Sequence, residues 1–151
     1  MNIKKWKTIT VGGQSGEQLL FSMKKLNYFV SEFANKIILS PYFKYGVERQ
    51  VDLAKIQVAE LGHVDGAQLG RIYQDVINLG LSSCLSDVGP GLRLEYSDQQ
   101  CEEVKVGMNP IDNEIFSLSK QENVSELHTC CGQLENYWPG GTYFVFEILH
   151  K

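Results

Sequence analysis

Residues 61–96 limit what this chain can fold into more than any other segment. Their apolar residues recur at the spacing of a helix that faces a hydrophobic core: Leu69, Ile72, Tyr73, Val76 and Ile77. Asp65, with Gln68 three residues later, predicts the N-cap of this helix. Gly80 predicts its end, because glycine readily adopts the left-handed conformation that terminates helices. The segment therefore predicts a packed domain, but it indicates no particular chemistry.

Other segments predict strands. Apolar and polar residues alternate in 92–96 and 104–108, which is typical of strands with one face in water. Further strands are predicted at residues 3–11, 51–58, 114–119, 126–131 and 142–149. The last of these is apolar on both faces, which favours a central position in the sheet.

Two more helices are predicted. One is opened by Ser15 in a capping box with Gln18, and the other is opened by Ser31 and ends near Leu39. Together with the strands, they predict an α+β fold: a mainly antiparallel sheet of about five or six strands with two or three helices packed on one side. Residues 1–151 are expected to form a single domain, since no flexible linker interrupts them.

Charge is distributed unevenly along the chain. Residues 1–45, the helical N-terminal part, carry seven lysines and two glutamates, whereas the β-rich residues 46–151 carry sixteen acidic and seven basic groups. The basic part either docks against the acidic remainder or binds a charged partner. Its lysines are few and are not mixed with arginine, so nucleic-acid binding is not expected.

Several classes of protein are not expected. No apolar run approaches the length of about 20 residues that a membrane-spanning helix needs, and no secretory signal follows the N-terminal lysines. The four cysteines lack the C-x2-C spacing of zinc sites and are expected to be reduced, which favours a cytoplasmic location. The G-G-Q-S-G segment lacks the lysine of a phosphate-binding loop. We therefore predict no cofactor, no metal and no membrane association.

Two histidines are the candidates for catalysis. His63 lies between Glu60 and Asp65, and His128 lies two residues before Cys130. Neither spacing matches a metal or nucleophile motif, so structural roles are favoured and no catalytic residue is predicted.

A ligand-binding site is a further hypothesis. Its candidate residues are Gly70, Tyr73, Arg93, Tyr96 and Trp138. Gly70 interrupts a helix where a ligand or a neighbouring backbone could approach, and Trp138 could form a pocket wall or cover the core. Arg93 is expected on the solvent-facing side of the sheet, together with Glu95, Glu103 and Lys105.

The sequence also resembles a known family over most of its length. Residues 59–99 read AELGHVDGAQLGRIYQDVINLGLSSCLSDVGPGLRLEYSDQ. They are similar to a family of small uncharacterised bacterial proteins in which an L-G-x-x-x-G-A segment leads through I-Y and L-G-L-x-x-C to V-G-P-x-L-R-L-x-Y. The resemblance extends to KTITVGGQ, SEFANKIIL and YWPGGTYFVFEI, but the chain departs from the family after Asp98 and at His63.

This resemblance implies a shared fold and no established activity. Members of the family belong to mobile or accessory genetic elements, and some carry a helicase label that the missing nucleotide loop of this chain does not support. The leading functional prediction is a non-enzymatic cytoplasmic binding or accessory protein. A small-molecule-binding protein with a cavity between helices and sheet is the alternative, followed by a small enzyme. Exposed sheet edges make a homodimer possible.

Overall fold

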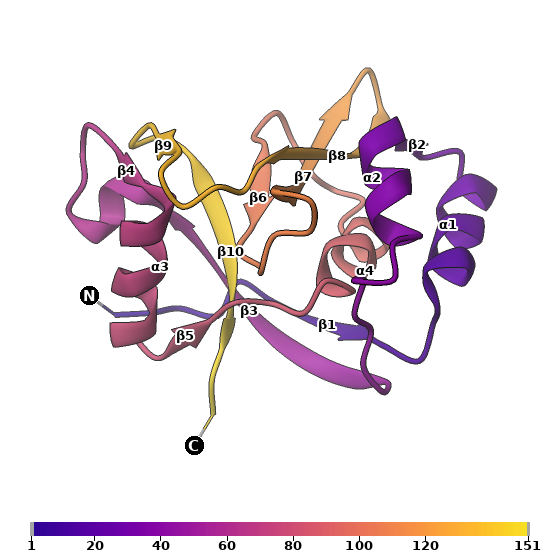
Figure 1. Ribbon diagram of the computed structural model, residues 1–151, viewed down its shortest axis with the longest axis horizontal. Coiled ribbons are helices and arrows are strands. Elements are labelled where there is room, and N and C mark those ends of the chain that lie inside the picture. Colours follow the sequence, from indigo (N-terminus) through magenta and orange to yellow (C-terminus); the bar gives the residue numbers. More distant parts are fainter. Residues whose placement is uncertain (1, 151) are drawn as a thin grey trace.

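A computed structural model describes residues 2–150 (Figure 1). Its strands are β1 (Lys7–Val11), β2 (Phe29–Val30), β3 (Arg49–Gln57), β4 (Ala67–Gln68), β5 (Leu81–Ser82), β6 (Val104–Val106), β7 (Glu114–Gln121), β8 (Val124–Cys131), β9 (Tyr137–Trp138) and β10 (Tyr143–Ile148). Its helices are α1 (Gly16–Lys25), α2 (Glu32–Ile38), α3 (Leu69–Asn78) and α4 (Val88–Glu95), with a 3-10 helix η1 (Val58–Leu61). The fold is α+β, as predicted.

The main sheet is larger and less regular than predicted. It has eight strands in the order β1-β3-β10-β6-β7-β8-β2, with β5 paired to β10. Because β10 runs parallel to β6, and β2 parallel to β8, the sheet is mixed and the prediction of five or six mainly antiparallel strands is wrong. Alternation of residues indicates which face of a strand is buried, but it carries no information on the direction of the neighbouring strand. The predicted central place of the last strand, β10, is confirmed.

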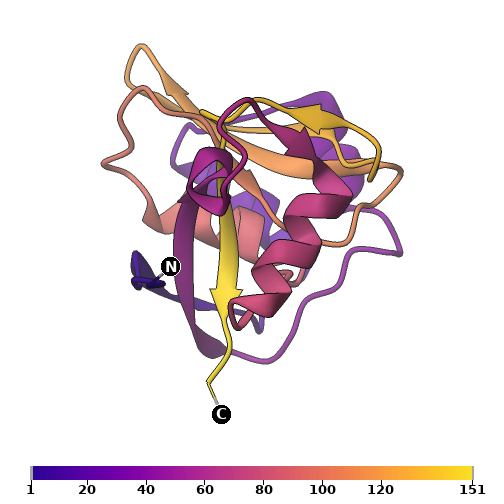
Figure 2. The ribbon, with the colours of Figure 1, turned by 90° about the vertical axis from the view of Figure 1, so that its left-hand side faces the viewer.

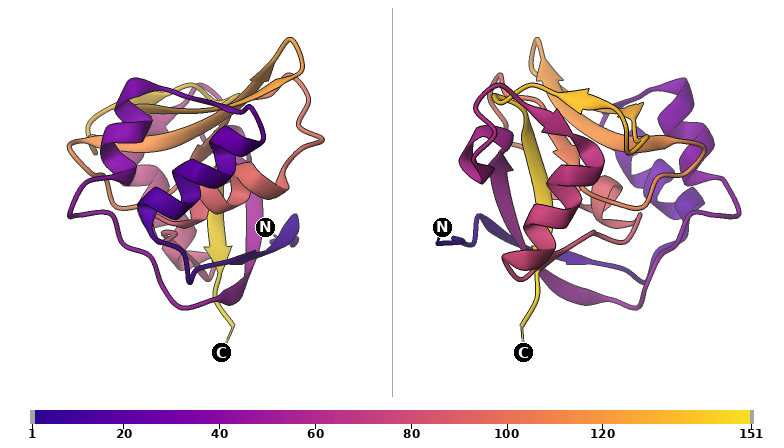
Figure 3. Two further views of the ribbon diagram at one scale, coloured as in Figure 1. Left: turned by 90° about the vertical axis from the view of Figure 1, so that its right-hand side faces the viewer. Right: turned by 60° about the vertical axis from the view of Figure 1, so that its left-hand side comes forward.

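Helices cover both faces of the sheet, not one face as predicted (Figure 2). The ring of Phe146 on β10 meets Tyr73 of α3 edge-on, with 5.7 Å between the centroids. The adjacent Val145 points to the opposite face, because side chains alternate along a strand. On that face the sheet packs against α4, where Gly89 lies directly against Phe116 of β7. Helices α1 and α2 lie beside α4 in the same layer (Figure 3).

The strand predicted at residues 92–96 is instead the helix α4. Pro90 lies in the first turn, where its missing N–H group costs no hydrogen bond. A side chain at Gly89 would place its Cβ 2.5 Å from Phe116, and one at Gly91 would place it 2.3 Å from Val11. The two glycines therefore let the helix lie directly on the strands. Tertiary packing of this kind overrides a short alternating pattern.

Helix α3 begins later than predicted. Its N-cap is Gln68, and the preceding residues 67–68 form β4, so Asp65 does not cap the helix. The pairing of β4 with β9 holds these residues in an extended conformation. Of the predicted apolar face, Leu69, Ile72 and Val76 are buried, whereas Ile77 is 65% exposed. Gly80 has a φ of 83°, which confirms the predicted left-handed end.

The capping predictions for the other two helices are confirmed. Ser15 and Gln18 form both hydrogen bonds of the capping box at α1, and the Ser31 hydroxyl accepts from the N–H of Ala34 at α2. Within residues 2–150, no helix combines the length and the apolar character needed to cross a membrane.

Candidate functional site

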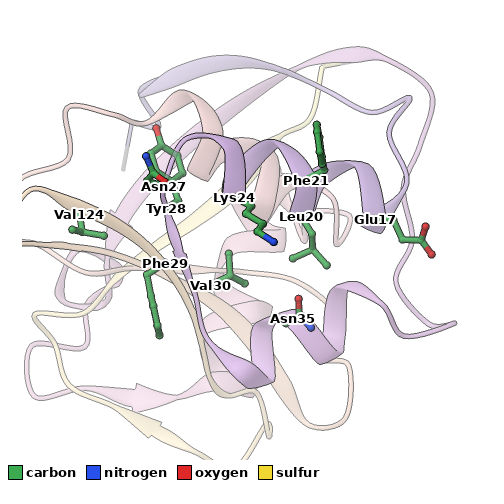
Figure 4. Close-up of a pocket in the computed structure, with 10 residues that line it drawn as sticks. All are labelled: Glu17, Leu20, Phe21, Lys24, Asn27, Tyr28, Phe29, Val30, Asn35 and Val124. Atoms are coloured by element: carbon green, nitrogen blue, oxygen red, sulfur yellow. The ribbon is translucent and has the colours of Figure 1, made fainter.

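A hollow lined largely by apolar side chains lies between α1, β2 and α2 (Figure 4). We call it the α1–β2 groove, and its volume is about 780 Å³. Figure 4 shows the side chains of Leu20, Lys24 and Val30 converging on its centre, while Glu17 points away at one end. The complete lining is Glu17, Leu20, Phe21, Lys24, Asn27, Tyr28, Phe29, Val30, Asn35 and Val124.

A tight turn places α1 and α2 at the two ends of β2. Asn27 has a φ of 59°, in the left-handed region that asparagine tolerates better than most residues. The N–H of Tyr28 then donates to the carbonyl of Met23 over 3.0 Å, which directs the chain into β2. Immediately after β2, Ser31 caps α2. Local hydrogen bonds thus fix the relative positions of both walls and the strand between them.

Large exposed apolar side chains are concentrated in the part of the chain that contains the groove. Eight of the fifteen exposed large apolar residues described in the chain fall within residues 21–47. Phe21 is 68% exposed, Phe33 is 61% exposed and Phe29 is 47% exposed. Scattered apolar residues are normal on a surface, but a concentration of phenylalanines beside a groove is typical of a binding surface.

Three lysines lie on α1 and α2, the two helices that flank the groove, and one of them, Lys24, lines it. Among the residues that the structure describes, Lys24, Lys25 and Lys36 form no ion pair. The N-terminal lysine that does pair, Lys7, lies 3.8 Å from Asp98 on another part of the molecule. Ion pairs to the acidic remainder of the chain therefore do not neutralise the charge beside the groove.

The predicted ligand residues do not form one site. Arg93 is completely buried in α4 and does not lie on a solvent-facing side of the sheet, so that prediction is wrong. Its guanidinium donates to the carbonyl of Tyr96 over 2.5 Å and to that of Ser119 over 3.0 Å. Its other acceptors are the side chain of Gln99 and the carbonyl of Glu126. Burial lowers the pKa of Arg93. The arrangement is that of a buried structural cation.

Tyr96 lies next to Arg93 and is also held by internal contacts. Its hydroxyl donates to the carboxylate of Glu102, and its ring meets Trp6 edge-on. Burial and the Glu102 carboxylate raise the pKa of Tyr96. The single O–H donor of this phenol is therefore already used within the protein.

Gly70, Tyr73 and Trp138 lie on the α3 side of the sheet. Gly70 allows close approach of a neighbouring backbone, since its N–H donates to the carbonyl of Leu134 over 2.9 Å. The Tyr73 hydroxyl donates to the carbonyl of Met108, and burial raises its pKa. Trp138 alone of the three lines a hollow, of about 450 Å³, together with Lys105 and other residues.

Internal contacts already satisfy the Lys105 amine, the positively charged group of this second hollow. The Lys105 amine lies 2.9 Å from the Glu103 carboxylate and 3.0 Å from the Ser117 hydroxyl. It also lies 5.5 Å from the centre of the Trp138 ring. An ammonium that donates to a carboxylate has no lone pair with which to accept the Ser117 proton, so the pair does not resemble an activated nucleophile. One group stays open: the buried Trp138 Nε1 has no partner within residues 2–150.

Each of the two candidate histidines pairs with one carboxylate. His63 pairs with Asp75 of α3 over 2.6 Å, whereas Glu60 accepts the backbone N–H of Gln57. His128 lies 3.0 Å from Glu126. Burial raises the pKa of the nearby Cys130 thiol to about 12, which keeps it protonated and unreactive at neutral pH.

All four cysteines are free thiols. No group of three His, Cys, Asp or Glu residues with the geometry of a metal site occurs in the part of the chain that the structure describes.

The groove was not predicted from the sequence, although two signals pointed toward it. The lysine excess of residues 1–45 marks the right part of the chain. In addition, Phe21 and Phe33 lie outside the buried positions Leu19, Met23 and Ile37 of their helices. An aromatic residue off the buried stripe of an amphipathic helix is a signal for a binding surface, but only the structure shows that Phe21 lines a groove.

Comparison with known proteins gave no match. No protein-family model, no curated protein and no solved structure matches the chain significantly. The resemblance to small bacterial accessory proteins therefore stays a prediction, and the functional argument depends on the surface itself.

Proposed function

We propose that this chain is a non-enzymatic, cytoplasmic accessory protein that binds a partner protein through the α1–β2 groove and the side chains around it. The observation that carries the proposal is the combination of exposed phenylalanines and unpaired lysines beside a hollow of about 780 Å³. Aromatic residues at the centre of a surface patch, with charged residues at its rim, are typical of protein interfaces.

Affinity purification from the source cell tests this proposal. The variant Phe21→Glu places a charge at a 68% exposed apolar position beside the groove. Ile77→Glu is the matched control, because Ile77 is 65% exposed but lies on α3. We expect a protein that is retained by the wild type and by Ile77→Glu and lost with Phe21→Glu, as quantified by mass spectrometry. Equal retention by all three proteins would contradict the proposal.

A second candidate function is the binding of a small molecule next to Trp138. It is favoured by the unpartnered Nε1 of that residue and by the adjoining hollow of about 450 Å³. Native mass spectrometry of gently purified protein tests it. An additional mass of a few hundred daltons, lost in Trp138→Leu and kept in Phe21→Glu, would support this function. A bare polypeptide mass would count against it.

A further inference from the structure

The backbone of β2 points to the way in which a partner would bind. β2 is the last strand at one end of the sheet and pairs with β8 alone. Its pairing is parallel, with Phe29 opposite Glu126 and Val30 opposite Leu127, and the N–H of Ser31 donates to Leu127. Backbone groups of successive strand residues point in alternating directions. The N–H and carbonyl of Val30 therefore point away from β8, toward the outside of the sheet.

An open strand edge beside an apolar hollow is suited to an extended peptide. Such a peptide forms backbone hydrogen bonds to the edge, and alternate side chains enter pockets next to it. Here Val30 itself lines the groove, with Leu20 facing the same space (Figure 4). A strand added to β2 would thus place every second side chain against an apolar surface.

Charge decides what kind of segment fits. Lys24 points into the groove beside Val30, and Lys25 and Lys36 lie close by in sequence on the two flanking helices. Two carboxylates lie on these helices: Glu17 lines the groove but points away at one end (Figure 4), and Glu32 lies in the first turn of α2. A second copy of the chain, paired edge to edge through β2, would bring the same lysines together and be repelled. An acidic segment would instead supply carboxylates that pair with these lysines.

We propose that the occupant of the α1–β2 groove is an extended, acidic segment of the partner protein, which adds a strand to β2 through the backbone of Val30. This inference rests on the proposed function, because it specifies how that surface is used. It identifies Val30 as the residue that holds the segment and Lys24 as a residue that selects for its charge.

A display experiment with random dodecapeptides tests the inference without knowledge of the partner. Immobilised wild-type protein is compared with Val30→Pro, which removes the outward N–H. Proline is tolerated on an edge strand where the N–H faces solvent, so this variant is expected to fold, and a melting curve checks that it does. We expect enrichment of acidic peptides with alternating apolar residues on the wild type and not on the variant.

The best peptide is then synthesised with and without N-methyl groups on alternate backbone nitrogens. Loss of one backbone hydrogen bond in Val30→Pro should weaken its binding about fivefold, and N-methylation should weaken it by at least about tenfold. Lys24→Glu should weaken binding and reverse its salt dependence, whereas Arg71→Glu on α3 serves as a control for charge alone.

Several results would overturn the inference. Enrichment of neutral or basic peptides would contradict the acidic segment, and equal binding of the N-methylated peptide would contradict strand addition. A dimer in sedimentation that dissociates with Phe21→Glu would identify a second copy as the occupant. Absence of any enriched peptide would also reject an extended segment. The affinity purification tests the proposed function separately. Loss of a partner with Phe21→Glu would support the binding surface even if the peptide experiments rejected strand addition.

Discussion

The α4 region and the α1–β2 groove place charged and apolar residues in opposite ways. In the α4 region the charged side chain of Arg93 is fully buried, whereas in the groove region the side chains of Phe21 and Phe33 are exposed to solvent. Arg93 is tolerated because backbone and side-chain acceptors bind both terminal nitrogens of its guanidinium, while its Nε has no partner within residues 2–150. Phe21 and Phe33 have no comparable compensation within the fold. The contacts of the first region explain its buried charge through stability, whereas the exposed residues of the second are the basis of the proposed binding surface.

The largest expected effect comes from removing the buried charge. Arg93→Met would leave the acceptor groups of Gln99, Tyr96 and Ser119 without their donor. Each buried unsatisfied group costs about 1–3 kcal/mol, so the free energy of unfolding should fall by at least about 3 kcal/mol. Urea denaturation measures this. A variant as stable as the wild type would show that Arg93 is dispensable for the fold and would restore a functional interpretation.

Filling the close contact beneath α4 should have the next largest effect. A Cβ at Gly91 would lie 2.3 Å from a methyl carbon of Val11, whereas a Cβ at Gly141 would meet nothing within 4 Å. Gly91→Ala should therefore lower the free energy of unfolding by about 1–3 kcal/mol through overpacking. Gly141→Ala is the control and should leave it nearly unchanged. Equal effects at both positions would contradict tight packing of α4 on β1.

A smaller, pH-dependent effect is expected at Glu102. Burial raises its pKa, but the hydrogen bond from Tyr96 and the charge of Lys55 outweigh burial and hold the pKa below its ordinary value. A carboxylate with a lowered pKa stabilises the fold above its unfolded pKa, and this contribution disappears as pH falls through the folded pKa. The difference in melting temperature between wild type and Glu102→Gln should shrink from about pH 7 to about pH 3. A difference in melting temperature that grows on acidification would contradict a stabilising role of the ionised Glu102 carboxylate.

The smallest effect on stability is expected in the groove region. Phe33 is 61% exposed, so Phe33→Ser should change the free energy of unfolding by no more than about 0.5 kcal/mol. The same denaturation series measures it beside Arg93→Met. Should Phe33→Ser prove strongly destabilising, the exposed phenylalanines would belong to the folding energetics, and the contrast between the two regions would fail.

The features that were predictable from the sequence are local. Ser15 and Gln18 cap α1 through hydrogen bonds between residues three apart, and Gly80 ends α3 through its own conformation. Residues 92–96 alternate over only five positions, which fits a strand and a buried helix equally well. Contacts of Gly89 and Gly91 with distant strands decide between the two, and a sequence pattern does not contain those contacts.

The candidate site was less predictable for the same reason. Gly70 was a candidate because glycine is unusual inside a helix, and Tyr73 because it lies on the same helix; both are explained by contacts with residues 134 and 108. The exposure of Phe29 depends on what packs over β2, which is set by elements elsewhere in the chain. The sequence marked the basic part of the molecule but not the hollow within it.

The central place of β10 has a consequence for how the protein is made. This strand joins β3, from early in the chain, to β6, so the two halves of the sheet, β1-β3 and β6-β7-β8-β2, are not connected without it. During synthesis the two halves of the sheet cannot join until residue 148 has left the ribosomal exit tunnel. Until then, part of the apolar surface of the earlier elements stays exposed to water. Folds dominated by such long-range pairing form slowly. The nascent chain therefore passes through an aggregation-prone interval, during which chaperones would have their greatest influence on yield.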